Sequence, residues 1–143
     1  MELDDKDEIL FCSFEDNVEN YHPKFILFIN HELKCVILAI RGTFSLDDVI
    51  IDLVCEEDIF LDGYAHGGIL KSAKKILELV EDILKTTLDK FPEYELVVTG
   101  HSLGAGSGIL VTLAILNGET VIEPHAKVKC LRTNTLFPNK YVL

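Results

Sequence analysis

The stretch from residue 97 to residue 106, VVTGHSLGAG, decides the fold, because an apolar run ends there and a helical pattern begins. At its centre lies a G-x-S-x-G motif, formed by Gly100, His101, Ser102, Leu103 and Gly104. The two outer glycines allow a tight turn between a strand and a helix, since they add no Cβ to a crowded junction. The motif therefore predicts a strained serine whose hydroxyl is held above the edge of a sheet.

Strand and helix patterns alternate on both sides of this motif. Two β-rich runs around a polar turn at residues 30–32 predict a hairpin, and the second run is continuous enough in apolar residues for a strand buried on both faces. The expected elements are this hairpin at 24–42, helices at 46–54, 69–90 and 103–117, and strands at 94–100 and 126–131. Such alternation predicts one α/β domain with a largely parallel sheet.

The segments outside these elements carry weaker signals. Residues 1–23 are acidic and are expected to form a loose lead-in or a short helix, and residues 55–68 are expected to form an acidic loop. Gly118 is expected to cap the helix before it, because glycine accepts left-handed dihedral angles. Residues 132–143 show no periodicity and are expected to form an irregular tail.

The net charge and the spacing of the cysteines exclude several classes of function. The 143 residues carry a formal net charge of −11, which argues against nucleic-acid binding and against attraction to anionic membranes. The acidic N-terminus shows no signal-peptide pattern, and the apolar runs are too short to span a bilayer. The four cysteines form no C-x-x-C pair, so we expect no metal site and no cofactor. We expect reduced, buried cysteines and a cytoplasmic protein that is at most peripheral at lipid surfaces.

The motif also has a chemical consequence for Ser102. At the start of a helix, the backbone N–H of Leu103 can donate a hydrogen bond to a developing oxyanion, and the helix dipole adds to this stabilisation. A glycine-rich turn with an idle serine is the alternative. A phosphate-binding loop is excluded, because no Gly-Lys-Ser/Thr sequence follows.

Three motifs in order, VILAIRGTFSLDDVIIDL, AHGGIL and VVTGHSLGAG, resemble the class 3 (fungal-type) lipases, and especially the branch that contains the sn-1-specific diacylglycerol lipases. The likeness extends from Lys24 to Cys130. It implies a partial α/β-hydrolase fold over residues 24–131, with an N-terminal hairpin, a mostly parallel sheet and helices on both faces. It also implies a serine hydrolase of carboxylic esters, with acylglycerols or other lipid esters as substrates and no metal.

The resemblance assigns roles by position. Ser102 matches the family's nucleophile, and Thr43 matches the residue that supplies an oxyanion donor, with the Leu103 N–H as the second donor. The residues agree with this, since Thr43 ends an apolar strand that is expected to point the same way as Gly100.

Two histidines and one segment also match family positions. His66 matches a histidine before the long helix and is expected to be structural. His101 is expected to be structural too, with its side chain turned away from that of Ser102. The stretch 45–57 matches the position of a lid, and an ordinary core-packing helix is the alternative.

A catalytic serine also needs a histidine base and an orienting carboxylate, in the chain order Ser, acid, His in this fold. After the serine, that order is formally met by Glu119, Glu123 and His125. A helix over 103–117 would carry the chain about 20 Å away at 1.5 Å per residue, so all three are rejected. The next strand is expected to return the chain to the catalytic edge near residues 132–133.

His22 and His31 precede the serine and lie outside these motifs. Neither is expected to serve as the base. No triad acid or histidine is therefore assigned. We expect the chain to be the N-terminal part of a lipase domain that lacks its C-terminal strands and is inactive alone, whether as a fragment, a splice form or a degenerate paralogue. The alternative function is a non-catalytic lipid- or protein-binding remnant of a lipase.

Overall fold

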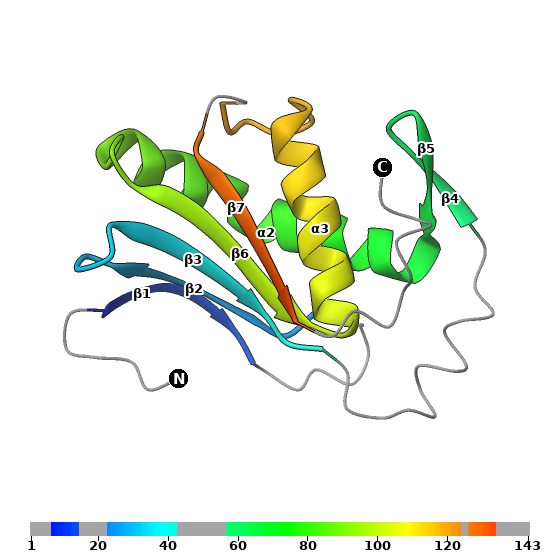
Figure 1. The fold of residues 1–143 in the computed structure, drawn as a ribbon, viewed down its shortest axis with the longest axis horizontal. Helices are drawn as coiled ribbons and strands as arrows, with labels where there is room; N and C mark the ends of the chain where they lie inside the picture. Colours follow the sequence, from blue (N-terminus) through cyan, green and yellow to red (C-terminus); the bar gives the residue numbers. More distant parts are fainter. Residues whose placement is uncertain (1–6, 15–22, 43–56, 124–125, 134–143) are drawn as a thin grey trace.

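A five-stranded sheet organises the residues that the computed structural model describes, which are 7–14, 23–42, 57–123 and 126–133 (Figure 1). Its strand order is β1-β2-β3-β6-β7, where the strands are β1 Asp7–Ser13, β2 Phe25–Asn30, β3 Cys35–Ile40, β6 Glu95–His101 and β7 Val128–Thr133. The pairs β1–β2 and β2–β3 are antiparallel, whereas β6 runs parallel to both β3 and β7. The predicted hairpin is confirmed.

The sheet is therefore mixed, and the prediction of a mostly parallel sheet holds only for its C-terminal half. A short turn, residues 31–34, joins β2 to β3, and so short a connection can join neighbouring strands only in antiparallel orientation. The parallel pairs β3–β6 and β6–β7 are each joined through a helix, as parallel neighbours require.

The N-terminal segment corrects a second expectation, because Asp7–Ser13 forms the edge strand β1 and not a loose lead-in or a helix. Its pairing with β2 shifts between Ile9 and Phe11, at a β-bulge or similar irregularity. Phe11 stacks on Phe25 with ring centroids 5.5 Å apart, so pairing partly buries an aromatic ring of this acidic segment. A contact with a residue fourteen positions away leaves no signal in the local pattern.

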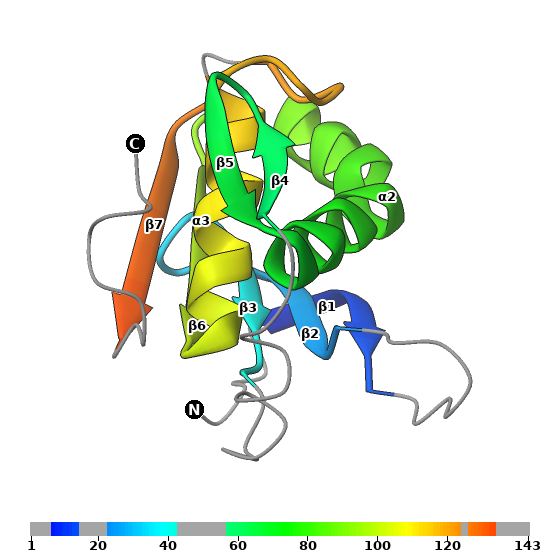
Figure 2. The ribbon, with the colours of Figure 1, turned by 90° about the vertical axis from the view of Figure 1, so that its right-hand side faces the viewer.

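Two helices cover one face of the sheet. They are α2, Gly67–Lys90, and α3, Leu103–Leu116, and both confirm the predicted helices to within a few residues. The helices contact each other and share a single apolar core with the sheet (Figure 2). The prediction of helices on both faces is not met by these two, and the helix predicted at 46–54 lies outside the described residues.

The burial pattern of the strands agrees with this one-sided cover. In β3 and over Glu95–Thr99 of β6, alternate residues are buried under the helices, and those between them are half-buried. The expectation that β3 is buried on both faces is therefore wrong for the described part of the molecule. The fully buried members are Val36, Leu38, Leu96 and Val98.

A second, two-stranded sheet stands where an acidic loop was expected. It consists of β4, Glu57–Phe60, and β5, Gly63–His66, paired antiparallel through a turn in which Leu61 has a positive φ of 52°. Phe60 packs against the main core and Ala65 is part of it. The hairpin forms because its inner face finds this core, which is a tertiary contact.

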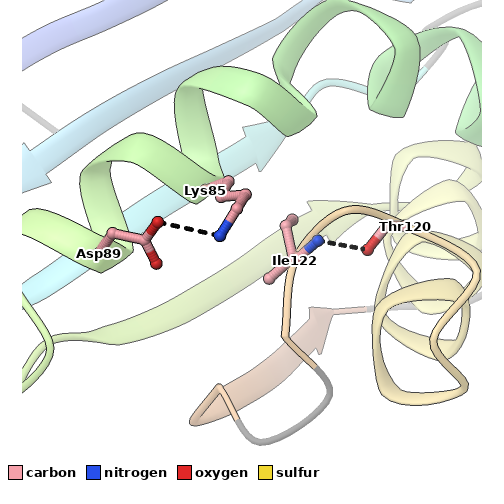
Figure 3. Close-up of polar contacts among 4 residues, drawn as sticks. All are labelled: Lys85, Asp89, Thr120 and Ile122. Atoms are coloured by element: carbon pink, nitrogen blue, oxygen red, sulfur yellow. Dashed lines mark hydrogen bonds and ion pairs between the residues drawn. The ribbon is translucent and has the colours of Figure 1, made fainter.

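The loop after α3 follows the C-terminal end of that helix, whereas Ser102 precedes the N-terminal end; Figure 3 shows two polar contacts, one within this loop and one on α2. The predicted cap is confirmed: Gly118 has a φ of 75°, and its N–H donates to the Ile115 carbonyl. Ile122 then enters the core, and its N–H donates to the Thr120 hydroxyl at 3.2 Å. On the facing helix, Lys85 forms an ion pair with Asp89 at 2.9 Å.

Three of the four cysteines fall within the described residues, and all three are free thiols. Cys12 is exposed, while Cys35 and Cys130 are half-buried, so the expectation of buried cysteines is wrong for Cys12, whose strand lies at the sheet edge. Burial, with a smaller effect of nearby Glu95, raises the pKa of the Cys35 thiol. No helix in the described ranges is long and apolar enough to cross a membrane.

Candidate active site at the end of strand β6

Ser102 lies between the end of β6 and the first residue of α3, as the motif predicted. Its backbone angles are φ 55° and ψ −124°, a region that residues with a Cβ rarely adopt. The residue holds the N-cap position of α3, yet its side chain makes no capping hydrogen bond. The hydroxyl is therefore not used to stabilise the helix, which is the usual role of a serine at this position. The predicted strained turn is confirmed.

The exposure of Ser102 differs from the open presentation that the motif predicted. The residue is only 6% exposed. Its carbonyl accepts the N–H groups of Ala105 and Gly106 at 3.0 and 3.2 Å, so the first turn of α3 covers it on one side. The side chain of Ser102 is therefore largely shielded from water.

The two glycines of the motif are required by packing. A Cβ on Gly100 would lie 2.5 Å from the carbonyl carbon and oxygen of Gly104. A Cβ on Gly104 would lie 2.5 Å from the Ile40 carbonyl oxygen and 2.9 Å from the Arg41 carbonyl carbon. Because these neighbours are backbone atoms, they cannot move aside as a side chain would. The two contacts hold the turn tight and press α3 onto the end of β3.

A third close contact joins Gly42 to the serine turn, and it was not predicted from the sequence. A Cβ there would lie 3.2 Å from the Ser102 Cβ and would also overlap the carbonyl oxygen of His101. The Arg41 N–H donates to the Lys24 carbonyl at 2.8 Å, which ties the end of β3 to the start of β2. A glycine directly after an apolar strand, as in the sequence IRGTF, was the available signal for this close approach.

His31 lies at the opposite end of the sheet from Ser102, which agrees with the prediction that it does not serve as the base. It occupies the β2–β3 turn, and the neighbouring Cys35 pairs with Glu95 at the start of β6. Ser102 follows the other end of β6, seven residues on, which at about 3.3 Å per residue is roughly 20 Å away. The His31 ring instead packs edge-on against Phe91, and its Nδ1 lies 2.9 Å from the hydroxyl of Tyr94.

The two carboxylates that follow the motif also lie at the far end. The Glu119 N–H donates to the Ala114 carbonyl near the C-terminal end of α3, 2.9 Å away. The Glu123 carbonyl accepts a hydrogen bond from the Ala126 N–H. The strand β7 begins two residues later, beside the start of β6. The length of α3 separates both from Ser102, which agrees with the prediction that neither is the triad acid. As predicted, β7 returns the chain to the catalytic edge, where Thr133 pairs with His101.

A family model described as Lipase (class 3) matches residues 37–132, a range that includes β3, β6, α3 and the serine turn between the last two. The chain belongs to the class 3 lipase family. Diacylglycerol lipase-beta of Mus musculus is 36% identical over 127 residues, which are 83% of this chain and 19% of that protein. Diacylglycerol lipase-alpha of Homo sapiens is 30% identical over 121 residues, 76% of this chain and 11% of that protein. The chain thus spans a fifth or less of these lipases.

Solved lipase structures share the fold. The lipase of Rhizopus microsporus var. chinensis superposes with a TM-score of 0.74 at 21% identity, over 91% of this chain and 45% of that one. The triacylglyceride lipase of Rhizomucor miehei gives 0.74 at 20% identity, over 89% and 48%. The mixed sheet and its two helices therefore form part of the α/β-hydrolase fold of lipases.

Several residues that the sequence-based predictions name lie outside the described residues. They are Thr43, most of the lid stretch 45–57, and the two remaining histidines, His22 and His125. Of the family positions that are described, His66 ends β5 and directly precedes α2, and His101 is exposed at the end of β6. Among the described residues, no group of three or more metal-ligating side chains comes together.

Proposed function

We propose that Ser102 is the nucleophile of a serine ester hydrolase that acts on acylglycerols. The observation that carries the proposal is the backbone of Ser102, held at φ 55° and ψ −124° with a hydroxyl that caps no helix. In the reaction, the serine oxygen attacks the ester carbonyl carbon, the alcohol leaves, and water releases the acid from the acyl-enzyme. A histidine would take the serine proton and pass it to the departing alcohol.

The oxyanion of this reaction would be held by the backbone N–H groups of Leu103 and Thr43. Leu103 is the first residue of α3, so its N–H has no acceptor one turn earlier in the helix. Gly42, next to Thr43 in the sequence, lies against Ser102, which supports Thr43 as the second donor. Donors fixed by the fold need no rearrangement as the charge develops, which makes them effective.

The base and its orienting acid would come from outside the described residues. In the described part of the chain, no histidine is hydrogen-bonded to the Ser102 hydroxyl. We place the base and the acid either in the remainder of a longer polypeptide or in another chain. The proposal thus assigns to residues 1–143 the nucleophile and the oxyanion donors of the site.

The proposed substrate is a diacylglycerol. This rests on the names of the relatives, which include diacylglycerol lipase-beta, diacylglycerol lipase-alpha and a secreted mono- and diacylglycerol lipase of Penicillium cyclopium. A comparison of diacylglycerol and triacylglycerol as substrates of the native polypeptide tests it, and faster hydrolysis of triacylglycerol would contradict it. The free thiols support the proposal of a cytoplasmic protein that works at lipid surfaces.

A fluorophosphonate probe tests the nucleophile, because it reacts with a serine whose hydroxyl is activated by a base. We expect labelling in the native polypeptide that contains residues 1–143, and no labelling after Ser102→Ala. The matched control is Ser107→Ala, which removes a buried hydroxyl from α3, the helix that follows Ser102, and should leave labelling unchanged. Labelling that persists in Ser102→Ala, or that is absent from the unaltered protein, contradicts the proposal.

A second candidate is a non-catalytic module that binds a lipid or a protein at the remnant of the site. The near-complete burial of Ser102 favours it. This candidate predicts that lipid binding survives while the probe fails to label Ser102 in any native form of the protein.

A further inference from the structure

The β4–β5 hairpin exposes two large apolar side chains. Ile59 and Tyr64 lie directly opposite each other in its ladder, so they share its outer face. They are 75% and 65% exposed. On the inner face, Phe60 packs against the core of the molecule and Ala65 is part of it. Because this core already buries the inner face, the fold of a single chain gives no reason for an apolar pair on the outer face.

The outer face also carries negative charge. Glu57 is two residues from Ile59 in β4, so their side chains lie on the same face of the hairpin. Asp62 lies in the turn that joins the two strands, and both carboxylates are exposed. Within the described ranges, neither of them forms an ion pair. The hairpin therefore offers two carboxylates beside its apolar pair.

Positive charge follows directly along the chain, in the first half of α2. Residues 63–77 hold three lysines, Lys71, Lys74 and Lys75, and no acidic residue. Lys75 forms an ion pair with Glu78 at 2.9 Å. Lys71 and Lys74 are exposed, and neither forms an ion pair with a residue that the structure describes. These two lysines are as free to meet a partner as the two carboxylates of the hairpin.

The hairpin and these lysines belong to one region of the surface. Figures 1 and 2 show the hairpin apart from the five-stranded sheet, beside the N-terminal end of α2. β5 leads directly into α2, and α2 contacts both strands of the hairpin. Lys71 lies only about 6 Å along the helix axis from Gly67, the first residue of α2, at 1.5 Å per residue.

A surface with both signs of charge discriminates between partners. A uniformly basic partner would be repelled by Lys71 and Lys74, and a strongly acidic one by Glu57 and Asp62. A second copy of this chain carries both signs in the same order. Related by a two-fold axis through the hairpin, it would bring its lysines onto these carboxylates and its carboxylates onto these lysines.

We propose that two copies of the chain dimerise through the outer faces of their β4–β5 hairpins. Ile59 and Tyr64 pack on the same pair of side chains in the second copy, around the two-fold axis. The hairpin carboxylates of each copy pair with the lysines of the other. So small a contact buries less than the roughly 800 Å² per partner of stable complexes, so the dimer is weak and in equilibrium with the monomer. This inference goes beyond the proposed function and does not depend on it.

Sedimentation equilibrium over a range of concentrations tests the apolar contact. The native polypeptide should dimerise, and Ile59→Gln with Tyr64→Gln should raise the dissociation constant on the order of 100-fold, because both copies lose apolar surface from the centre of the contact. The matched control is Leu33→Gln, because Leu33 is 67% exposed but lies in the β2–β3 turn. It should dimerise as the unaltered protein does.

Reversal of charge tests the pairing. Lys71→Glu with Lys74→Glu, and separately Glu57→Lys with Asp62→Lys, should each raise the dissociation constant on the order of tenfold, because like charges then meet across the axis. An equimolar mixture of the two variants should dimerise again, since each carboxylate faces a lysine in the mixed dimer. Net charge alone predicts the opposite for the second variant. Its formal charge changes from −11 to −7, two units for each substitution, and weaker repulsion would favour its dimer.

The proposal is wrong if the native polypeptide sediments as a monomer at every concentration, or if the mixture of charge variants does not recover the dimer. A monomer that floats with neutral lipid vesicles would assign the outer face to a lipid surface instead. Ser102→Ala should dimerise as the unaltered protein does. Fluorophosphonate labelling of the Ile59 and Tyr64 variant should persist, so the failure of the dimer and the failure of the nucleophile are separate results.

Discussion

At Ser102, a residue with a side chain holds dihedral angles that cost on the order of 1–3 kcal/mol. The strain persists because the turn is determined from three sides by close backbone contacts at Gly42, Gly100 and Gly104. No single one of these residues explains the turn. Together they pack the turn closely around Ser102, whose side chain makes no capping hydrogen bond.

The first prediction at this scale concerns Gly104. We expect Gly104→Ala to lower the free energy of unfolding by about 3 kcal/mol, because the new Cβ would overlap backbone atoms of Ile40 and Arg41 that cannot move aside. Urea denaturation measures the effect. The control is Gly106→Ala, whose Cβ would meet side-chain atoms of Ile69 and no backbone atom among its three nearest neighbours. Equal losses in the two variants would show that the contact with β3 does not hold the turn.

At the scale of the elements, the position of the nucleophile depends on how α3 packs on β6 and β3. α3 is apolar almost all round, and it approaches the sheet through Gly108, which lies against Val98 and Ile40. The half of the sheet that carries the nucleophile is completed by β7, an edge strand among the described residues, with Leu131 exposed. An ion pair between Lys129 of β7 and Glu95 of β6 links the two strands.

This ion pair predicts a pH dependence of stability. The hydrogen bond from Lys129 holds the pKa of Glu95 below its usual 4.5. The pair therefore stabilises the fold above about pH 4.5, and this contribution is lost as the pH falls through the lower pKa of the folded state. Lys129→Gln should lower the melting temperature by on the order of 1 °C at pH 7, because exposed ion pairs contribute little.

At about pH 2 the unaltered chain and Lys129→Gln should melt together, since Glu95 is then protonated in both. Lys74→Gln, which removes an exposed lysine from α2, controls for the change in net charge. A difference between Lys129→Gln and the unaltered chain that stays constant from pH 7 to pH 2 would show that the ion pair is not its cause.

At the scale of the whole molecule, the described residues supply a positioned serine but no base hydrogen-bonded to it. We therefore expect the 143-residue polypeptide alone to hydrolyse p-nitrophenyl esters at a rate on the order of 10⁴-fold or more below that of a complete triad. Addition of an acid and a histidine, from a longer polypeptide or a partner chain, should restore the activity.

Ser102→Ala is the control for this assay. Robust turnover by the 143 residues that disappears in Ser102→Ala would contradict the prediction. It would show that a base is present within the chain, and His22 and His125 would be the next residues to replace. Turnover that survives Ser102→Ala would point to a different nucleophile.

The sequence by itself determined the elements whose cause is local. The serine turn follows from the glycines at 100 and 104, the two long helices from apolar spacing, and the β2–β3 hairpin from two β-rich runs around a polar turn. The length of the predicted helix was enough to place Glu119 and Glu123 away from Ser102, since the rise per residue of a helix is constant. In each of these cases, the residues that decide the structure are neighbours in the sequence.

Only the tertiary structure decided the features that depend on distant partners. Asp7–Ser13 is a strand because it pairs with β2, and the β4–β5 hairpin exists because Phe60 and Ala65 find the core. Ser102 is buried because Gly42 lies against it and the first turn of α3 covers it. A local pattern records the periodicity of a segment, whereas pairing and burial depend on residues that are brought close only when the whole chain folds.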